Sequence, residues 1–138
     1  DPCKSIFKKV QSYVFPSLPN MTDNPKVNVA KIAGKLMALG ETPMQVEFDP
    51  HTLKTIGVSE PVPGGFAYKT TAHPHLEDEH AYNVVVKFGM FSHYKIYDTA
   101  KPGNQPLASI PVQKPAYLHG FGMSKNYFII AAGPLTVV

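Results

Sequence analysis

The chain has 138 residues, of which 43% are hydrophobic and 17% are charged, and this composition fits a folded domain and excludes a disordered chain. Its 14 prolines argue for many turns and few long helices. The net charge of +3 comes from lysines scattered along a chain without arginine, which argues against nucleic acid as a partner. The single cysteine, Cys3, excludes an internal disulfide and a cysteine-built metal site.

Residues 1–26 are expected to form an N-terminal helix followed by a loop. Ile6, Val10 and Tyr13 recur at helical spacing between lysines, and residues 17–26 are rich in Pro, Asn and Asp. Such an amphipathic helix could cap the fold, or it could touch a membrane surface through its apolar side. The sequence leaves both alternatives open.

From residue 27 onward, short apolar segments alternate with turn signals and predict a meander of strands. The first unit would have strands at residues 27–32, 35–39, 44–48 and 53–56, and the second at residues 71–75, 81–88, 92–98 and 107–112. A third unit begins at Tyr117 and stays unfinished. Four-stranded units that repeat every 40–50 residues or so are typical of a β-propeller, whereas a β-sandwich shares the strand spacing but not the repeat.

We therefore expect residues 27–138 to form about two and a half blades of one domain, too few to close a ring. The chain begins at Asp1 and stops in the apolar pair Val137-Val138, so we expect a fragment of a longer protein. No targeting segment is visible and no apolar run approaches the roughly 18 residues of a membrane-spanning helix. We expect an intracellular protein, either cytoplasmic or peripheral to a membrane.

Polar residues occupy matching points of the successive units. Asn28, His73 and His119 follow one another at intervals of about 45 residues, and each histidine precedes a turn and an apolar strand. Side chains at equivalent strand starts of adjacent blades can meet near a propeller axis, and imidazole is the commonest neutral metal ligand. The repeat therefore indicates a metal site that contains His73 and His119, although a lone histidine is more often a core or surface residue.

Glu41 follows the apolar segment 35–39 and precedes Thr42-Pro43. A carboxylate at this point could accept the free N–H of a ligating imidazole and fix its tautomer, whereas the alternative is a solvated glutamate at a strand end. His75 would crowd an ion already bound by His73, and we expect it at the rim of the site.

The remaining histidines are expected at the surface or in packing; they are His51, His80 and His93. No phosphate loop, nucleophile elbow, CxxC or HExxH motif is present, so we assign no catalytic side chain.

Several motifs together resemble a known family. They include Gly40-Glu41-Thr42-Pro43, Phe48-Asp49-Pro50-His51-Thr52-Leu53, Thr71-Ala72-His73-Pro74-His75 and Leu118-His119-Gly120-Phe121-Gly122-Met123. With these motifs, nearly the whole chain resembles the N-terminal part of the carotenoid cleavage oxygenases, the family that also contains stilbene-cleaving dioxygenases and the animal retinoid isomerohydrolase.

The resemblance implies a seven-bladed β-propeller with an Fe(II) ion on its axis, held by four histidines. In this scheme His73 is the first ligand, His119 is the second, and Glu41 hydrogen-bonds a ligating imidazole. With O2 as co-substrate, such an enzyme would cleave one C=C bond of a carotenoid or apocarotenoid to aldehyde or ketone ends. The resemblance also implies a hydrophobic polyene substrate and a peripheral contact with a membrane.

The two other ligands implied by the resemblance would lie beyond residue 138, so the chain alone is expected to be inactive. Two alternatives stay open, namely a non-catalytic propeller segment with a binding or structural role, and an isomerohydrolase of retinyl esters within the same family. Gly120 departs from the family pattern, which often has a larger residue such as Ser or Asp after the histidine. This departure concerns local packing and leaves the ligand itself in place.

Overall fold

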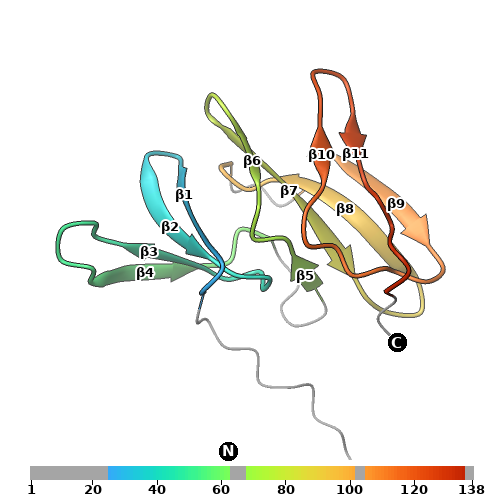
Figure 1. Cartoon of the computed structure of the whole chain (residues 1–138), viewed down its shortest axis with the longest axis horizontal. Helices are drawn as coiled ribbons and strands as arrows, with labels where there is room; N and C mark the ends of the chain where they lie inside the picture. Colours follow the sequence, from blue (N-terminus) through green and yellow to red (C-terminus); the bar gives the residue numbers. More distant parts are fainter. Residues whose placement is uncertain (1–24, 63–67, 102–104, 136–138) are drawn as a thin grey trace, which may run out of the picture.

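The computed structural model describes residues 25–62, 68–101 and 105–135, and within these ranges every regular element is a β-strand. The predicted all-β class is therefore confirmed. The helix expected within residues 1–16 lies outside the described residues. Three antiparallel sheets follow one another across the molecule (Figure 1).

The first sheet has four antiparallel strands in chain order, which are β1 (Asn28–Ile32), β2 (Lys35–Leu39), β3 (Gln45–Phe48) and β4 (Thr55–Ser59). Ala33 and Gly34 join β1 to β2 in a two-residue turn, in which φ is 48° and 81°, respectively. Positive φ at both central residues is the type I′ geometry, which matches the twist of a hairpin. The predicted bounds of β1, β2 and β3 agree with these to within one residue.

Strand β4 begins later than the predicted strand at residues 53–56. Asp49 accounts for the difference, because its Oδ1 accepts hydrogen bonds from the amides of His51 and Thr52 and from the Thr52 hydroxyl. The amide of Leu53 donates to the carbonyl of Asp49, and Leu53 has a left-handed φ of 57°. Leu53 therefore belongs to the turn and not to the strand.

The second sheet has five strands, which are β5 (Tyr68–Thr70), β6 (His75–Glu77), β7 (His80–Lys87), β8 (Ser92–Asp98) and β9 (Ala108–Val112). They pair in the order β5-β7-β8-β9, and β6 also pairs with β7. The predicted strands at residues 81–88, 92–98 and 107–112 agree with β7, β8 and β9 to within one residue at each end.

The predicted strand at residues 71–75 is wrong, because of these residues only His75 lies in a strand, β6, which extends to Glu77. Strand β5 pairs Thr70 with Val85, and β6 pairs His75 with Tyr82. Four residues, 71–74, therefore face only two residues of β7, and the two extra residues form an irregular bulge in the ladder. Pro74, which lacks an N–H group, lies within this bulge.

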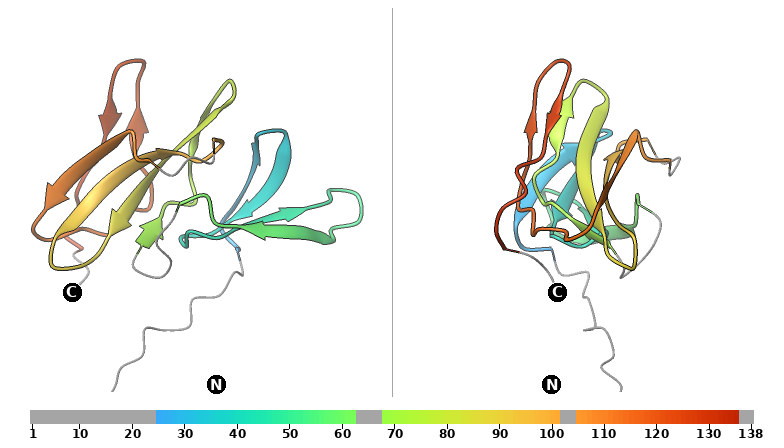
Figure 2. Two further views of the ribbon diagram at one scale, coloured as in Figure 1. Left: turned by 180° about the vertical axis from the view of Figure 1, so that it is seen from behind. Right: turned by 90° about the vertical axis from the view of Figure 1, so that its right-hand side faces the viewer.

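A short hairpin of β10 (Gly122–Met123) and β11 (Phe128–Ile129) begins the third unit. It stands beside the hairpin of β6 and β7 in Figures 1 and 2. The ring of Tyr82 on β7 meets the ring of Phe128 on β11 edge to face, with centroids 5.5 Å apart. The second and third units are thus packed against each other through side chains.

Strand β7 is buried on both faces and connects the cores of the molecule. Val84 and Val86 pack toward the third unit in a cluster with Tyr94, Ile96 and Leu118. Ala81 joins the cluster of the first sheet, which contains Ala30, Ile32, Met37, Leu39 and Ala72. Antiparallel sheets that bury both faces of a middle sheet in this way are consistent with part of a β-propeller.

Candidate metal centre

His73 projects from the bulge between β5 and β6. Its side chain is exposed, and its backbone amide donates to the hydroxyl oxygen of Thr71 at 3.2 Å. In a regular strand a side chain points to one face of the sheet, and a bulge changes that direction. Bulges are frequent beside functional sites. His73 therefore points away from its own sheet because the two strands on either side of it pair with different parts of β7.

His119 lies in the segment that leads from β9 to β10. Its Nε2 atom is 3.1 Å from the Nε2 atom of His73, and the two ring centroids are 4.7 Å apart with an interplanar angle of 63°. The structure thus brings together the two histidines that the repeat paired. Neither lies within a strand, although the sequence analysis expected both at strand starts.

Glu41 lies between β2 and β3, and its Oε1 atom is 2.9 Å from Nδ1 of His119. Two contacts anchor its segment to the second sheet. The amide of Thr70 donates to the Glu41 carbonyl, and the Thr70 hydroxyl donates to the Thr42 carbonyl. Since a carboxylate only accepts, a neutral His119 ring would carry its proton on Nδ1 in this pair, which leaves its Nε2 lone pair toward His73.

Tyr117 is part of the site although the sequence analysis gave it no role. Its hydroxyl donates to the same Oε1 atom of Glu41 that accepts from His119. The hydrogen bond to Glu41 is the main cause that raises the pKa of the Tyr117 phenol, and burial and the negative charge of Glu41 add to it. The signal was the Tyr117-Leu118-His119 alternation, which places positions 117 and 119 on one side of an extended segment.

The two imidazoles fit a shared metal ion. Imidazole nitrogens bind divalent ions such as zinc at about 2.0–2.1 Å, so nitrogens 3.1 Å apart would subtend roughly 95–100° at one ion. That angle is close to the right angle between neighbouring ligands of an octahedral centre. The same separation also suits an N–H···N hydrogen bond with His73 as the donor.

No cluster of three or more His, Cys, Asp and Glu side chains suited to a metal occurs in residues 25–62, 68–101 and 105–135. The other histidines make separate contacts. His75 contacts the carbonyl oxygen of Phe121 at 2.8 Å, His80 contacts the Asp98 carboxylate at 2.7 Å, and His93 contacts the carbonyl oxygen of Phe91 at 3.0 Å. His51 is exposed in the turn before β4.

The match to a family model covers almost the whole chain. The model described as retinal pigment epithelial membrane protein matches residues 5–138.

Similar full-length proteins are carotenoid dioxygenases by name. The beta,beta-carotene 15,15'-dioxygenases of Rattus norvegicus and Homo sapiens are 33% and 32% identical to the chain, over 97% of its length. The mitochondrial carotenoid-cleaving dioxygenase of Macaca fascicularis is 33% identical over 98% of the chain. The chain spans 27–28% of the length of these relatives. It therefore belongs to the retinal pigment epithelial membrane protein family, whose members include carotenoid-cleaving dioxygenases, as its histidine motifs indicated.

Proposed function

We propose that this chain is part of a non-haem iron oxygenase that cleaves a C=C bond of carotenoids or apocarotenoids to aldehyde or ketone products. The observation that carries the proposal is the convergence of His73 and His119, whose Nε2 atoms lie 3.1 Å apart. The contact of Glu41 with Nδ1 of His119 supports the proposal, because a metal-binding histidine usually donates its other ring N–H to a carboxylate, a backbone carbonyl or water. The names of the relatives support carotenoids as the substrate class.

The chain's own residues would prepare the metal site in three ways. His73 and His119 would each offer a neutral nitrogen, which leaves the charge of Fe(II) uncompensated. Glu41 would hold the tautomer and the orientation of the His119 ring. Tyr117, by donating to Glu41, would fix the carboxylate in turn. Bound iron would supply the capacity to activate O2 for reaction with an electron-rich double bond.

Two imidazoles are too few for a four-histidine centre, so the remaining ligands would lie outside these 138 residues. Residues 27–138 would then be incomplete blades of one propeller domain, preceded by residues 1–26. On this proposal the isolated chain would bind divalent metal weakly and would not turn over substrate. A hydrophobic polyene would approach the ion from parts of the protein that these residues do not contain.

An exposed apolar turn supports a peripheral contact with a membrane. Met90 and Phe91, between β7 and β8, are 92% and 75% exposed. Large apolar side chains at the tip of a turn can enter the headgroup region of a bilayer. In the described ranges, no helix has the length and apolarity to cross a membrane.

The test uses the full-length protein that carries this chain. We expect His73→Ala and His119→Ala each to remove bound iron and oxygen-dependent cleavage, measured by metal analysis and by mass spectrometry of products. His51→Ala, in an exposed turn, is the matched control and should keep both. Iron retained at full stoichiometry in both site variants would contradict the proposal and favour a non-catalytic propeller segment. Retinol from a retinyl ester, without incorporation of oxygen from O2, would favour isomerohydrolase chemistry instead.

A further inference from the structure

We propose that Thr71, Asn83 and Asn28 are positioning residues for His73, acting through the backbone of the bulge that carries it. The inference rests on the proposed function, because it assigns these residues to the same metal site. His119 has a carboxylate against its ring, whereas in the described part of the chain no carboxylate hydrogen-bonds the His73 ring. Besides the contact of its ring with His119, the hydrogen bonds that position His73 within the described residues are those of its main chain and of the two residues before it.

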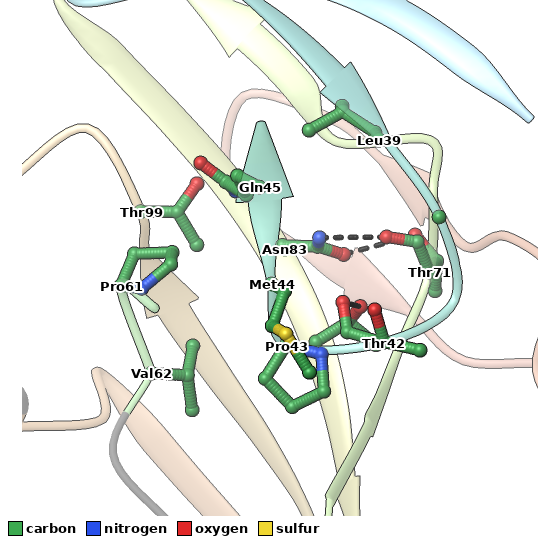
Figure 3. Close-up of a pocket in the computed structure, with 12 residues that line it drawn as sticks. Leu39, Thr42, Pro43, Met44, Gln45, Pro61, Val62, Thr71, Asn83 and Thr99 are labelled. Atoms are coloured by element: carbon green, nitrogen blue, oxygen red, sulfur yellow. Dashed lines mark hydrogen bonds between the residues drawn. The ribbon is translucent and has the colours of Figure 1, made fainter. Parts of the chain in front are cut away.

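Asn83 fills the gap that the bulge leaves in the ladder. It lies on β7 opposite residues 71–74, between the pairs Thr70–Val85 and His75–Tyr82. Its side-chain amide donates to the carbonyl of Thr71 at 2.9 Å, and its side-chain oxygen accepts from the Thr71 hydroxyl at 2.9 Å (Figure 3). The Asn83 side chain thus supplies the donor to the Thr71 carbonyl, while the Thr71 amide still donates to the carbonyl of Val84.

The contacts continue through the next two residues to the ligand. The Thr71 hydroxyl that donates to Asn83 also accepts from the amide of His73. From the first sheet, the side-chain amide of Asn28 donates to the carbonyl of Ala72 at 2.9 Å. Residues 71, 72 and 73 are therefore each held by a side chain, from two different sheets.

Burial makes this network costly to disturb. Thr71 and Asn83 are 2% and 3% exposed and line a small polar pocket between the first and second sheets (Figure 3). A buried polar group that loses its partner keeps its desolvation penalty. The hydrogen bonds of Asn83 account for a polar side chain among the apolar residues of β7. A valine at this position would remove the donor to the Thr71 carbonyl and the acceptor of the Thr71 hydroxyl proton.

The consequence for metal binding is geometric. A small displacement of a ligating or reacting group has a large effect on a preorganised site. If the bulge relaxes, His73 moves relative to His119, whose position is fixed separately by Glu41. Removal of partners that orient a metal ligand typically lowers metal affinity by about 10-fold to 100-fold.

The experiment compares Thr71→Val with Thr71→Ser in the full-length protein. Valine keeps the shape and removes the hydroxyl, whereas serine keeps both of its hydrogen bonds. Thr99→Val is the matched control, because it removes a buried hydroxyl that lines the same pocket but donates to the Ala81 carbonyl and not to a residue of the bulge. The readouts are Fe(II) affinity by chelator competition, the absorption spectrum of the Co(II)-substituted protein, and thermal stability.

We expect Thr71→Val to weaken Fe(II) binding about tenfold or more and to change the Co(II) spectrum, while Thr71→Ser restores both. Thr99→Val should lower stability without changing either metal readout. Equal metal affinity in Thr71→Val and Thr99→Val, or a failure of serine to restore binding, would overturn the inference. Asn28→Ala, at the edge of the network, repeats the comparison if Thr71→Val does not fold. His73→Ala separates the two proposals, since iron retention in that variant would refute the function itself.

Discussion

The Nε2 atom of His75 lies 2.8 Å from the carbonyl oxygen of Phe121, and these residues are 46 positions apart, as are His73 and His119. The two histidine-bearing segments therefore run side by side in the same register. The ring of His75 also meets the ring of Phe121 edge to face, with centroids 4.7 Å apart. His75 thus fixes the spacing of the two segments at a point two residues after the proposed ligands His73 and His119. This contact is a physical reason to expect His75 at the rim of the metal site and not as a ligand.

Glu41→Gln should weaken Fe(II) binding by about 10-fold to 100-fold, measured by chelator competition in the full-length protein. A glutamine side chain carries no charge, so its oxygen is a weaker acceptor than Oε1 of Glu41 for the two hydrogen bonds from His119 and Tyr117. Glu47→Gln is the matched control, because Glu47 pairs with Lys35 on the surface of the first sheet. Equal loss of iron in both variants would show that Glu41 has no specific role.

The phenol of Tyr117 should report on the same carboxylate. Its pKa is raised because its hydroxyl donates to Glu41, so the proton is held to higher pH than in an isolated tyrosine. A phenol pKa that is higher in the folded state stabilises the protein below about pH 10, and this contribution is lost as the pH rises through the folded pKa. In Glu41→Gln, ultraviolet titration should show one tyrosine that ionises at lower pH. An unchanged titration curve would argue against the Tyr117–Glu41 contact.

Asp98→Asn should lower the free energy of unfolding at pH 7 by about 1–3 kcal/mol. Burial alone would raise the pKa of Asp98, but hydrogen bonds from the amides of Ala81 and Ala100 and from His80 outweigh it and lower the pKa below 3.8. The folded carboxylate therefore adds stability above about pH 4, and this contribution is lost as the pH falls through the lowered pKa.

Urea unfolding at pH 7 and at pH 3 checks the sign of this effect. The difference between the parent protein and Asp98→Asn should shrink at the lower pH. Asp78→Asn serves as the control, since Asp78 lies in an exposed turn with a φ of 51°, a conformation that asparagine also adopts. A difference that grows toward pH 3 would contradict the assignment.

Two nearby glycines should respond differently to alanine. A Cβ atom at Gly122 would come 3.3 Å from the Cβ of its cross-strand partner Ile129, whereas a Cβ at Gly120 would meet no atom within 4 Å. We expect Gly122→Ala to destabilise the protein by about 1 kcal/mol and Gly120→Ala to be neutral or slightly stabilising, as judged by thermal unfolding. Gly120→Ser should be tolerated as well, so the departure from the family pattern carries no packing demand. A large loss at Gly120 would show that its backbone is constrained in another way.

Met90→Ser combined with Phe91→Ser should reduce sedimentation of the full-length protein with phosphatidylcholine vesicles. Both side chains lie almost free of contacts in the turn between β7 and β8, so the change should leave stability nearly unaltered. Leu53→Ser is the matched control, because Leu53 is 76% exposed on the distant turn of the first sheet. Similar losses with both changes would indicate general stickiness and not a membrane-facing turn.

Much of the fold could be predicted from local patterns. Apolar alternation and turn residues predicted the exact first and last residues of β2 and β8, because turn-forming residues flank both strands. The prediction for residues 71–75 was wrong because the strand period is broken there by pairing with β7, a contact that local sequence does not encode. The 45-residue repeat nevertheless brought out His73 and His119, since a repeat carries information about long-range contact that a single strand does not.

The supporting residues were harder to predict. Asn83 differed from its neighbours as a polar residue within an apolar strand, which is a recognisable signal of a buried network. Asn28 appeared only as a member of the repeat, and its contact is with Ala72 rather than with a metal-site side chain. Tyr117 gave no signal except its alternation with His119. Side chains that hold other side chains are specified by three-dimensional proximity, so single-sequence patterns rarely reveal them.

The pair of Glu41 and His119 joins the first unit of the chain directly to the third, across 78 positions. Recombination between related genes at a blade boundary would separate the two partners. The His119 imidazole of one parent would then face a glutamate whose position is set by the backbone of the other parent. Family shuffling libraries should therefore inherit the interval from Glu41 to His119 from one parent. Within that interval, we expect a substitution in the connection between β2 and β3 to be accompanied by a compensating substitution in the segment before β10.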